Sequence, residues 1–304
     1  MQKEENHINK IEIANLARRQ KKVSVCMITY NHEKFISQAI EGVLMQETDF
    51  DFELVIGEDF STDTTRAICE QYANKYPEKI RLLPSSRNFG SMRNFMRTLN
   101  ECRGEYIALC EGDDYWTDPL KLQKQVDILE NSDRYNLCFH NVDVVNNTGV
   151  FIGKVYMEGR KKEISFTDLA KGDYTKTCSV VFKNTTLFKS FIQNQNYIHQ
   201  DTTLFLTLLE DGTGYYLNET MAAYRLHEGG IWTGKNAFQR NKDGIINNRI
   251  IAEYYSNRKE KIYFKNEILR LIKGNFVICK NDKRYSKAFK YFLLYLFYTI
   301  KQKL

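Results

Sequence analysis

Short apolar segments alternate with helix-like segments over the first 130 residues of the chain. The apolar runs at 23–28, 52–59, 79–86 and 105–110 have the length of buried strands. Each run is followed by a segment in which apolar residues recur at helical spacing or in which residues typical of helix ends occur. Strands that alternate with helices in this way predict a parallel sheet covered by helices on both faces.

Residues that favour helix ends indicate where the predicted helices start and stop. Ser61 or Thr62 is suited to cap the helix after the second strand. Gly104 is suited to end the helix after the third strand. Pro119 is suited to the first turn of the helix after the fourth strand.

The alternation loosens after about residue 135. Segments 135–145, 150–157 and 176–184 have the pattern of mixed or antiparallel strands, an apolar helix opens on Asp201, and a strand within 219–234 leads into a glycine-containing loop. From 235 onward the chain is helical and basic. The pattern therefore predicts an α/β fold with a mostly parallel, mixed sheet flanked by helices and a helical C-terminal extension. The boundaries that we expect are a charged N-terminal segment at 1–22, a globular domain at 23–234 with halves 23–131 and 132–234, and a basic region at 235–304.

Composition narrows the class of protein without identifying a partner. The net charge of +6 is too small, and the basic residues too dispersed, to favour DNA or RNA. The 7 cysteines include no CxxC pair, which fits a reduced, cytoplasmic protein better than a disulfide framework or a zinc site. We see no secretory signal in the N-terminal segment, and no apolar run approaches the ~20 residues of a membrane span.

The last segment of the chain, 288–304, is apolar and aromatic. Lys290 and Lys301 bound its apolar stretch, which is about half as long as a membrane span. Aromatic residues beside lysines suit peripheral contact with a membrane surface. Packing of the segment on its own domain is the alternative.

Polar residues gather directly after three of the predicted strands, at 29–31, 58–63 and 111–116. Ligands bind beyond the carboxyl ends of the strands in open α/β sheets, so these segments should converge on one site. The last segment holds three acids, Glu111, Asp113 and Asp114, whose mutual repulsion a divalent cation such as Mn²⁺ or Mg²⁺ would relieve. The alternative is an exposed acidic turn that caps the next helix. The chain has no GxGxxG after its first strand, no Walker sequence and no GxSxG.

Four segments together resemble a family 2 glycosyltransferase of the GT-A fold. They are "VSVCMITYNHEKFISQAIEGVLMQ", "FELVIGEDFSTDTT", "SSRNFGSMRNF" and "GEYIALCEGDDYWTDPLKLQKQ". The resemblance resumes at "TCSVVFKN", "IHQDTTLFLTLLEDG" and "AAYRLHEGGIWTG". It implies a Rossmann-like GT-A domain and an inverting enzyme that moves a sugar from a nucleotide-diphosphate donor to an acceptor hydroxyl.

The resemblance also assigns donor-binding and metal-binding residues. In the family, the segment after the first strand lines the nucleotide pocket and the acid after the second strand reads the base. The acid-x-acid metal motif falls on Glu111-Gly112-Asp113, where the first acid is usually Asp, so Asp113 is the ligand that we favour. The donor-binding residues implied are Thr29, Tyr30, Asn31, Asp59, Arg93, Glu111, Gly112, Asp113 and Arg225. The metal ligands implied are Asp113, Glu111, Asp114 and His227, with Mn²⁺ or Mg²⁺ as the cofactor.

The general base of the family corresponds to Asp201, which opens a helix in the acceptor half. The alternative for Asp201 is a plain helix cap, a position that Asp favours. Arg225 and His227 are expected near the diphosphate. We interpret His32, His140 and His199 as structural.

The function that follows is transfer from a nucleotide sugar, with UDP-sugar as the family's most frequent donor, to a saccharide or lipid-linked glycan. Cell-surface polysaccharide synthesis, as for lipopolysaccharide or capsule, is the expected setting, in the cytoplasm or at the inner face of the cell membrane. Two alternatives remain open. One is a sugar nucleotidyltransferase, and the other is a catalytically impaired GT-A protein that binds nucleotide sugar or carbohydrate, which the Glu at 111 favours.

Overall fold

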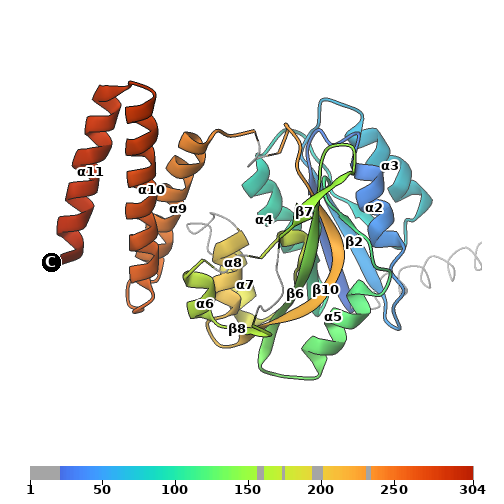
Figure 1. Ribbon diagram of the computed structural model, residues 1–304. Coiled ribbons are helices and arrows are strands. Elements are labelled where there is room, and N and C mark those ends of the chain that lie inside the picture. Colours follow the sequence, from blue (N-terminus) through green and yellow to red (C-terminus); the bar gives the residue numbers. More distant parts are fainter. Residues whose placement is uncertain (1–20, 156–160, 173–174, 194–200, 231–233, 304) are drawn as a thin grey trace, which may run out of the picture.

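A mixed β-sheet runs through the centre of the protein (Figure 1). The computed structural model describes residues 21–155, 161–172, 175–193, 201–230 and 234–303. In these residues the main sheet path is β3 (Ile80–Leu82), β2 (Phe52–Glu58), β1 (Val23–Thr29), β4 (Tyr106–Leu109), β9 (Val181–Lys183), β6 (Tyr135–Val145), β10 (Thr213–Arg225) and β5 (Tyr115–Trp116). Two further strands lie off this path: β7 (Phe151–Lys154) pairs with β6, and β8 (Glu163–Ile164) pairs with β10.

Most of the long strands point the same way. Strands β1, β2, β3 and β4 pair in parallel, and β10 pairs in parallel with β6. Strand β9 lies between the two parallel groups and is antiparallel to both β4 and β6, so the two groups run in the same direction. The carboxyl ends of β1, β2, β4, β6 and β10 therefore lie along one edge of the sheet, and the predicted mostly parallel, mixed sheet is confirmed.

Helices cover both faces of the sheet (Figure 1). On one side lie α2 (Ile36–Leu44), α3 (Thr65–Lys75) and α5 (Lys121–Glu130). On the other lie α4 (Ser91–Glu101), α6 (Phe166–Ala170), α7 (Thr186–Gln193) and α8 (Asp201–Leu208), with the short 3₁₀ turn η1 (Thr177–Ser179) beside the sheet. Because both faces are covered, the central strands are largely apolar, and Met27, Leu54, Ile107 and Phe139 are fully buried.

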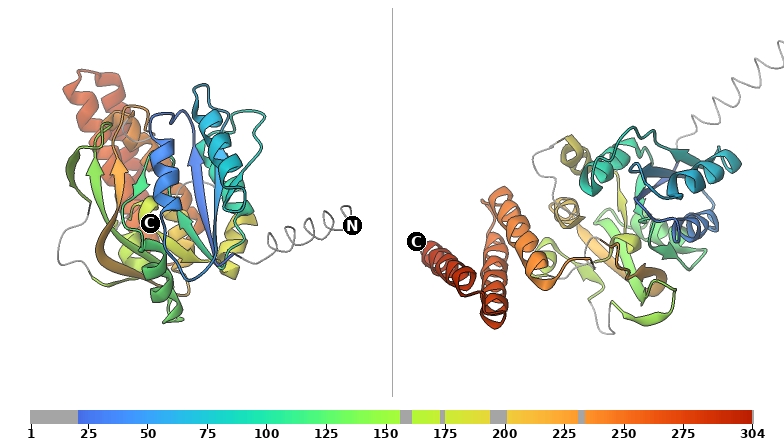
Figure 2. Two further views of the ribbon diagram at one scale, coloured as in Figure 1. Left: turned by 90° about the vertical axis from the view of Figure 1, so that its right-hand side faces the viewer. Right: turned by 90° about the horizontal axis from the view of Figure 1, so that it is seen from above.

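Three C-terminal helices stand to one side of this domain, α9 (Ala237–Tyr254), α10 (Lys261–Asn281) and α11 (Tyr285–Lys303), as the view from above shows (Figure 2). Helix α10 packs against both α9 and α11, and α11 lies farthest from the sheet. The predicted helical extension is confirmed. Among the described helices, none combines the length and apolar character that crossing a bilayer requires.

Three helix ends differ from the prediction. Pro119, which was expected in the first turn of α5, lies before its N-cap residue Leu120. Helix α3 begins at Thr65, and the carboxylate of Asp63 accepts the Thr65 N–H at 2.9 Å, so neither Ser61 nor Thr62 caps it. Helix α4 ends at Glu101, before Gly104.

The 7 cysteines, which were expected to be reduced, are all free and buried. Of the predicted N-terminal segment, residues 1–20 lie outside the described residues.

Gly104 is required by close packing rather than by a helix end. A Cβ at this position would lie 2.5 Å from the Ser24 nitrogen and 2.8 Å from the Tyr106 oxygen, which are backbone atoms that cannot move independently. We expect Gly104→Ala to destabilise the protein by about 1–3 kcal/mol, the usual cost of overpacking. Urea unfolding measures this cost. Gly153→Ala in β7 is the matched control, because its Cβ would meet no atom within 4 Å, and equal stability of the two variants would contradict the packing argument.

Candidate active site

The loops that follow the parallel strands meet at one edge of the sheet, as the polar strand ends predicted. The Asp59 N–H donates to the Thr29 carbonyl at 3.0 Å, and the Gly112 N–H donates to the Ile28 carbonyl at 2.9 Å. The Arg225 N–H donates to Asp114 Oδ1 at 2.8 Å. These bonds tie the loops after β1, β2, β4 and β10 to one another, so their side chains form one site.

The loops after β1 and β2 are held together through Asn31. Its backbone is left-handed, with φ 55°, which Asn tolerates better than most residues. Its N–H donates to Ser61 Oγ at 2.9 Å, and its Oδ1 accepts the Thr62 N–H at 2.9 Å. Because Asn31 makes these bonds, its role in the structure is to shape the loop. The neighbouring Tyr30 is left 41% exposed.

Asp59 holds the loop before α4 in place. Its two carboxylate oxygens accept the N–H groups of Phe89 at 2.7 Å and Gly90 at 2.9 Å, and the residue is 2% exposed. Each carboxylate oxygen can accept a second hydrogen bond, so the contact of Asp59 with a base edge stays a prediction. Arg93, one turn into α4 from the same loop, is exposed.

Asp113 points toward two histidines. Its Oδ2 lies 3.1 Å from His227 Nε2 and 3.8 Å from His32 Nε2, and one ligand atom from each of the three residues lies within 4.8 Å of the others. Burial raises the pKa of Asp113, but the hydrogen bond from His227 and the two imidazoles outweigh it, so the pKa is lowered. For His32, burial has the opposite effect and lowers the pKa, although the charge of Asp113 opposes this change. An ionised carboxylate and a neutral imidazole are the forms that bind metal ions.

His32 is the residue that sequence reasoning missed, because we interpreted it as structural. Its Nδ1 lies 3.2 Å from Thr29 Oγ1. A hydrogen bond there fixes the ring and leaves Nε2 facing Asp113, which is how metal-binding histidines are commonly held. Gly112 allows this arrangement, since a Cβ on it would lie 2.6 Å from Thr29 Oγ1. The available signal was the position of His32 directly after a polar strand end.

Arg225 supports the Asp113 loop from behind. Its side chain donates to the Asp113 carbonyl at 2.9 Å, the Asn146 carbonyl at 3.3 Å and Gln38 Oε1 at 2.6 Å, and it lies over the ring of Phe35. The residue is only 4% exposed. These bonds use three of the five guanidinium N–H groups and make Arg225 a positioning residue for the Asp113 loop, while its place near a diphosphate stays a prediction.

Asp114 also lies outside the histidine cluster. It is buried, and its Oδ1 accepts the Arg225 N–H, which joins the acidic loop to the end of β10. Burial, with Asp113 and Glu111 nearby, raises its pKa well above the usual range. Of the predicted metal ligands, Asp113 and His227 belong to the cluster, whereas Glu111 and Asp114 do not.

Glu111 faces the opposite side of the loop. Its Oε2 is buried and has no hydrogen-bond partner among the residues that the structure describes. Burial raises the pKa of Glu111 to about 7; Thr177 opposes this rise by hydrogen bonding, while the charges of Asp113 and Asp201 add to it. The acid-x-acid motif therefore directs one carboxylate to the histidines and the other toward η1 and α8.

Asp201 is the first residue of α8, as predicted. Its Oδ1 accepts the Thr202 N–H at 2.7 Å. Burial raises the pKa of Asp201, and the bonds from Thr202 and the charge of Lys176 only partly oppose the rise. The residue is half-buried by accessible surface, and a carboxylate in its ionised form can accept a proton. Of the remaining histidines, His140 is buried with Nδ1 2.7 Å from the Asn141 carbonyl, and His199 lies outside the described residues.

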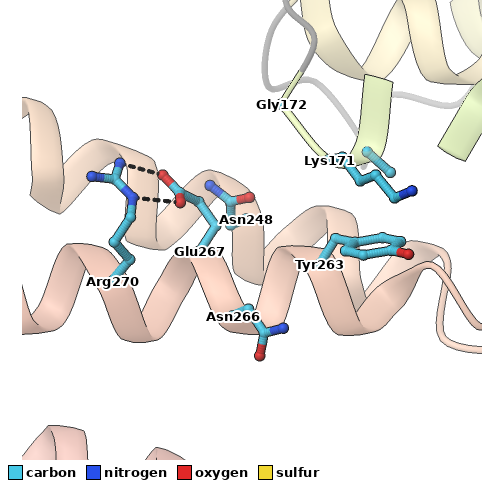
Figure 3. A pocket seen from close by; sticks show the side chains of 8 residues that line it. Lys171, Gly172, Asn248, Tyr263, Asn266, Glu267 and Arg270 are labelled. Atoms are coloured by element: carbon cyan, nitrogen blue, oxygen red, sulfur yellow. Dashed lines mark hydrogen bonds and ion pairs between the residues drawn. The ribbon is translucent and has the colours of Figure 1, made fainter. Parts of the chain in front are cut away.

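A separate hollow of about 410 Å³ lies between the end of α6 and helices α9 and α10 (Figure 3). Two of the charged residues that line it, Glu267 and Arg270, pair with each other at 2.6 Å. None of the residues that line it belongs to the histidine cluster or to the loops at the strand ends. The strand-end site, where carboxylates and imidazoles converge, is therefore the candidate active site.

The residues of the strand-end site fit a divalent cation. The cluster of His32, Asp113 and His227 supplies two imidazole nitrogens and one carboxylate oxygen at ligand spacing. The surrounding loops are fixed by backbone hydrogen bonds, so the three groups are held in place without the ion. A cation there would be bound by Asp113, His32 and His227.

Comparison with known proteins gives consistent matches. The family model described as "Glycosyl transferase family 2" matches residues 24–194. An uncharacterized protein of Mycobacterium tuberculosis is 38% identical over 210 residues, which are 69% of this chain and 60% of that protein. The chain thus spans less than two thirds of that relative's length.

Two further matches cover a larger share of the matched protein. The Escherichia coli protein named UDP-Glc:alpha-D-GlcNAc-diphosphoundecaprenol beta-1,3-glucosyltransferase WfgD is 27% identical over 267 residues, 86% of this chain and 98% of that protein. The crystal structure of Staphylococcus aureus TarS 1–349 in complex with UDP-GlcNAc superposes with a TM-score of 0.60 at 17% identity, covering 83% of this chain and 71% of TarS. The likeness to TarS concerns the fold.

Proposed function

The chain belongs to glycosyl transferase family 2, and from this premise we propose that it transfers a sugar from a UDP-sugar to a saccharide hydroxyl with inversion. The observation that carries the proposal is the division of the acid-x-acid loop. Asp113 faces His32 and His227 on one side, and Glu111 lies toward Asp201 on the other. Donor diphosphate and acceptor hydroxyl would thus approach the anomeric carbon from opposite sides of one loop.

The donor side is the side of β1 and β2. Tyr30, which is exposed beside the Asp113 cluster, can stack on the uracil ring. Thr29 and Asn31 shape the loop that carries it. Arg93 is exposed near the same loops and is free to contact the donor. A divalent cation held by Asp113, His32 and His227 would neutralise the charge that builds up on the departing diphosphate.

The acceptor side is the side of α8. Asp201 removes the proton of the acceptor hydroxyl as its oxygen forms a bond to the anomeric carbon. The bond from that carbon to the diphosphate oxygen breaks in the same displacement, and the electron pair leaves with the nucleoside diphosphate. Attack from the face opposite the leaving group inverts the configuration.

Two relatives support the donor and acceptor classes. TarS is solved with UDP-GlcNAc, and the name of WfgD specifies a UDP-glucose donor and a GlcNAc-diphosphoundecaprenol acceptor. By analogy we propose a lipid-linked saccharide acceptor and a role in cell-surface polysaccharide synthesis. A lipid-linked acceptor would bring the enzyme to the membrane surface.

The proposed function is tested by incubating the full chain with Mn²⁺, a panel of UDP-sugars and a synthetic GlcNAc-diphosphate-lipid. We expect release of UDP that depends on both donor and acceptor, and a product whose anomeric configuration, read by NMR, is opposite to that of the donor. Absence of turnover for every donor, together with UDP binding by calorimetry, would favour the catalytically impaired alternative. Retained configuration would contradict the single displacement.

The metal proposal makes a prediction about His32. Imidazole ligands suit Mn²⁺ better than Mg²⁺, which prefers oxygen ligands. We therefore expect His32→Gln to weaken Mn²⁺ binding by about 10–100-fold and to reduce the preference for Mn²⁺ over Mg²⁺. Electron paramagnetic resonance titration of free Mn²⁺ measures the affinity directly.

The matched control for His32→Gln is Glu33→Gln. This change removes a charge from the same loop but leaves the cluster intact, and Gln can still accept from the Thr64 N–H. We expect the control to bind Mn²⁺ within about threefold of wild type. Unchanged affinity in His32→Gln would restore the interpretation of His32 as a purely structural residue.

A further inference from the structure

Helix α11 exposes an apolar stripe on one face. Its exposed apolar residues recur every three or four positions, which at about 100° per residue places them on one side of the helix. They are between 40% and 66% exposed. The stripe consists of Tyr285, Phe289, Phe292, Leu293, Leu296, Phe297 and Ile300.

The opposite face of α11 already supplies the packing that holds the helix. Ala288 is buried, and the Tyr291 ring lies 5.6 Å from that of Phe238 in α9. The edge of the stripe contacts α10, where the rings of Phe292 and Phe276 are 6.1 Å apart. The stripe is therefore apolar surface beyond what the helical extension needs for its own packing, on the helix farthest from the sheet (Figure 2).

The charge around the stripe has one sign. The chain from 283 to 304 contains no Asp or Glu. Lys290 precedes Phe297 by two helical turns, so it lies along the same edge of the stripe, and Lys287 lies on the adjoining row. Both lysines are exposed. An apolar face bordered by lysines, with no acidic residue on the same helix, complements a surface that has an apolar interior and an anionic outer layer.

We propose that α11 binds an anionic lipid surface, lying in the plane of the headgroups with the stripe turned inward. Aromatic and aliphatic side chains enter the boundary between headgroups and acyl chains, while lysines contact lipid phosphates. A second copy of the chain complements the stripe less well, because pairing along it brings lysine rows together with no acid on α11 to neutralise them. This contact does not depend on the transferase reaction.

The test is cosedimentation of the full chain with vesicles of phosphatidylcholine alone or mixed equally with phosphatidylglycerol. We expect binding to the mixed vesicles at low salt, and weak binding to phosphatidylcholine. The triple variant Phe289→Ser, Phe297→Ser, Ile300→Ser should bind the mixed vesicles at least tenfold more weakly, because it removes three of the four most exposed residues of the stripe. The double variant Lys287→Gln, Lys290→Gln should lose about tenfold and show less dependence on salt.

The control is the pair Ile246→Ser and Val277→Ser, which removes apolar residues of α9 and α10 that are 51% and 44% exposed. It should leave vesicle binding unchanged. Equal binding of the triple variant and the control, or lysine variants that bind as wild type, would overturn the proposal. A third outcome would also overturn it. If the wild-type chain is a dimer in sedimentation equilibrium, the triple variant is a monomer, and neither binds vesicles, then a second copy of the chain occupies the stripe. Thermal melting checks that each variant is folded. If the triple variant does not fold, the double lysine variant still tests the proposal, because both lysines are exposed.

Discussion

Asp201→Asn should lower kcat by about two to four orders of magnitude, the usual worth of a general base. The variant is nearly isosteric and can still accept the Thr202 N–H, which lies 2.7 Å from Asp201 Oδ1. It cannot accept a proton from the acceptor hydroxyl. Since the histidine cluster does not include Asp201, we expect the Kd for UDP and Mn²⁺ to change by less than about threefold. Initial rates and calorimetry on the same preparation measure the two quantities.

The pH dependence of proton transfer to Asp201 has a defined sign. Burial raises the pKa of Asp201, and only the ionised form accepts the proton, so kcat should fall as the pH is lowered through that raised pKa. Folding stability responds in the opposite sense. A carboxyl group whose pKa is raised by folding destabilises the folded protein above that pKa, and the loss disappears as the group is protonated at lower pH. Asp201→Asn should therefore melt at the wild-type temperature or higher at pH 8.

Asp211→Asn is the matched control for the base, because Asp211 follows the same helix but bonds Asn136, away from the site. It should retain kcat within about threefold. Loss of UDP binding in Asp201→Asn, or transfer within tenfold of wild type, would contradict the assignment. Glu111, whose pKa is raised to about 7 on the same side of the loop, would then be the base to test with Glu111→Gln.

Asp113→Asn should reduce metal-dependent transfer on the order of a thousandfold or more, and EDTA should do the same to the wild-type enzyme. Asp113 is the one carboxylate in the cluster with His32 and His227, so its amide loses the charge that binds the cation. Mn²⁺ titration and turnover with a UDP-sugar measure the two effects together.

The control for Asp113→Asn is Asp63→Asn. Asp63 also has a lowered pKa: burial raises it, but its hydrogen bonds with Thr65 and Glu33 outweigh that effect. It lies outside the cluster, so Mn²⁺ affinity should stay within about threefold. Both carboxylates stabilise the folded protein above their unfolded pKa and lose that effect as the pH falls, so both variants should lose some stability at pH 7. Full wild-type activity in EDTA would show that no cation takes part.

Periodicity alone was sufficient to predict the α/β class and the covered, mostly parallel sheet. Apart from Ser24 and Glu105, the segments 23–28 and 105–110 are apolar because both faces of the sheet are covered, and this pattern is local in the sequence. The convergence of the polar strand ends followed from the geometry of parallel sheets. The adjacency of Asp113 and His227 required the resemblance to a family, since nothing in the spacing of residues 113 and 227 indicates that they meet.

Only the tertiary structure decided which way each polar side chain at the site faces. Asp59, Asp114 and Arg225 are as polar as Asp113, yet they are buried against backbone groups of neighbouring loops. A buried N–H or C=O group needs a partner, and which side chain supplies it depends on how loops far apart in the sequence pack. His32 stayed free to face Asp113 because Thr29 holds its other nitrogen and Gly112 leaves room for both. The sequence by itself thus determined the sheet and the edge where the chemistry lies, whereas long-range hydrogen bonding determined which residues at that edge are left for a ligand.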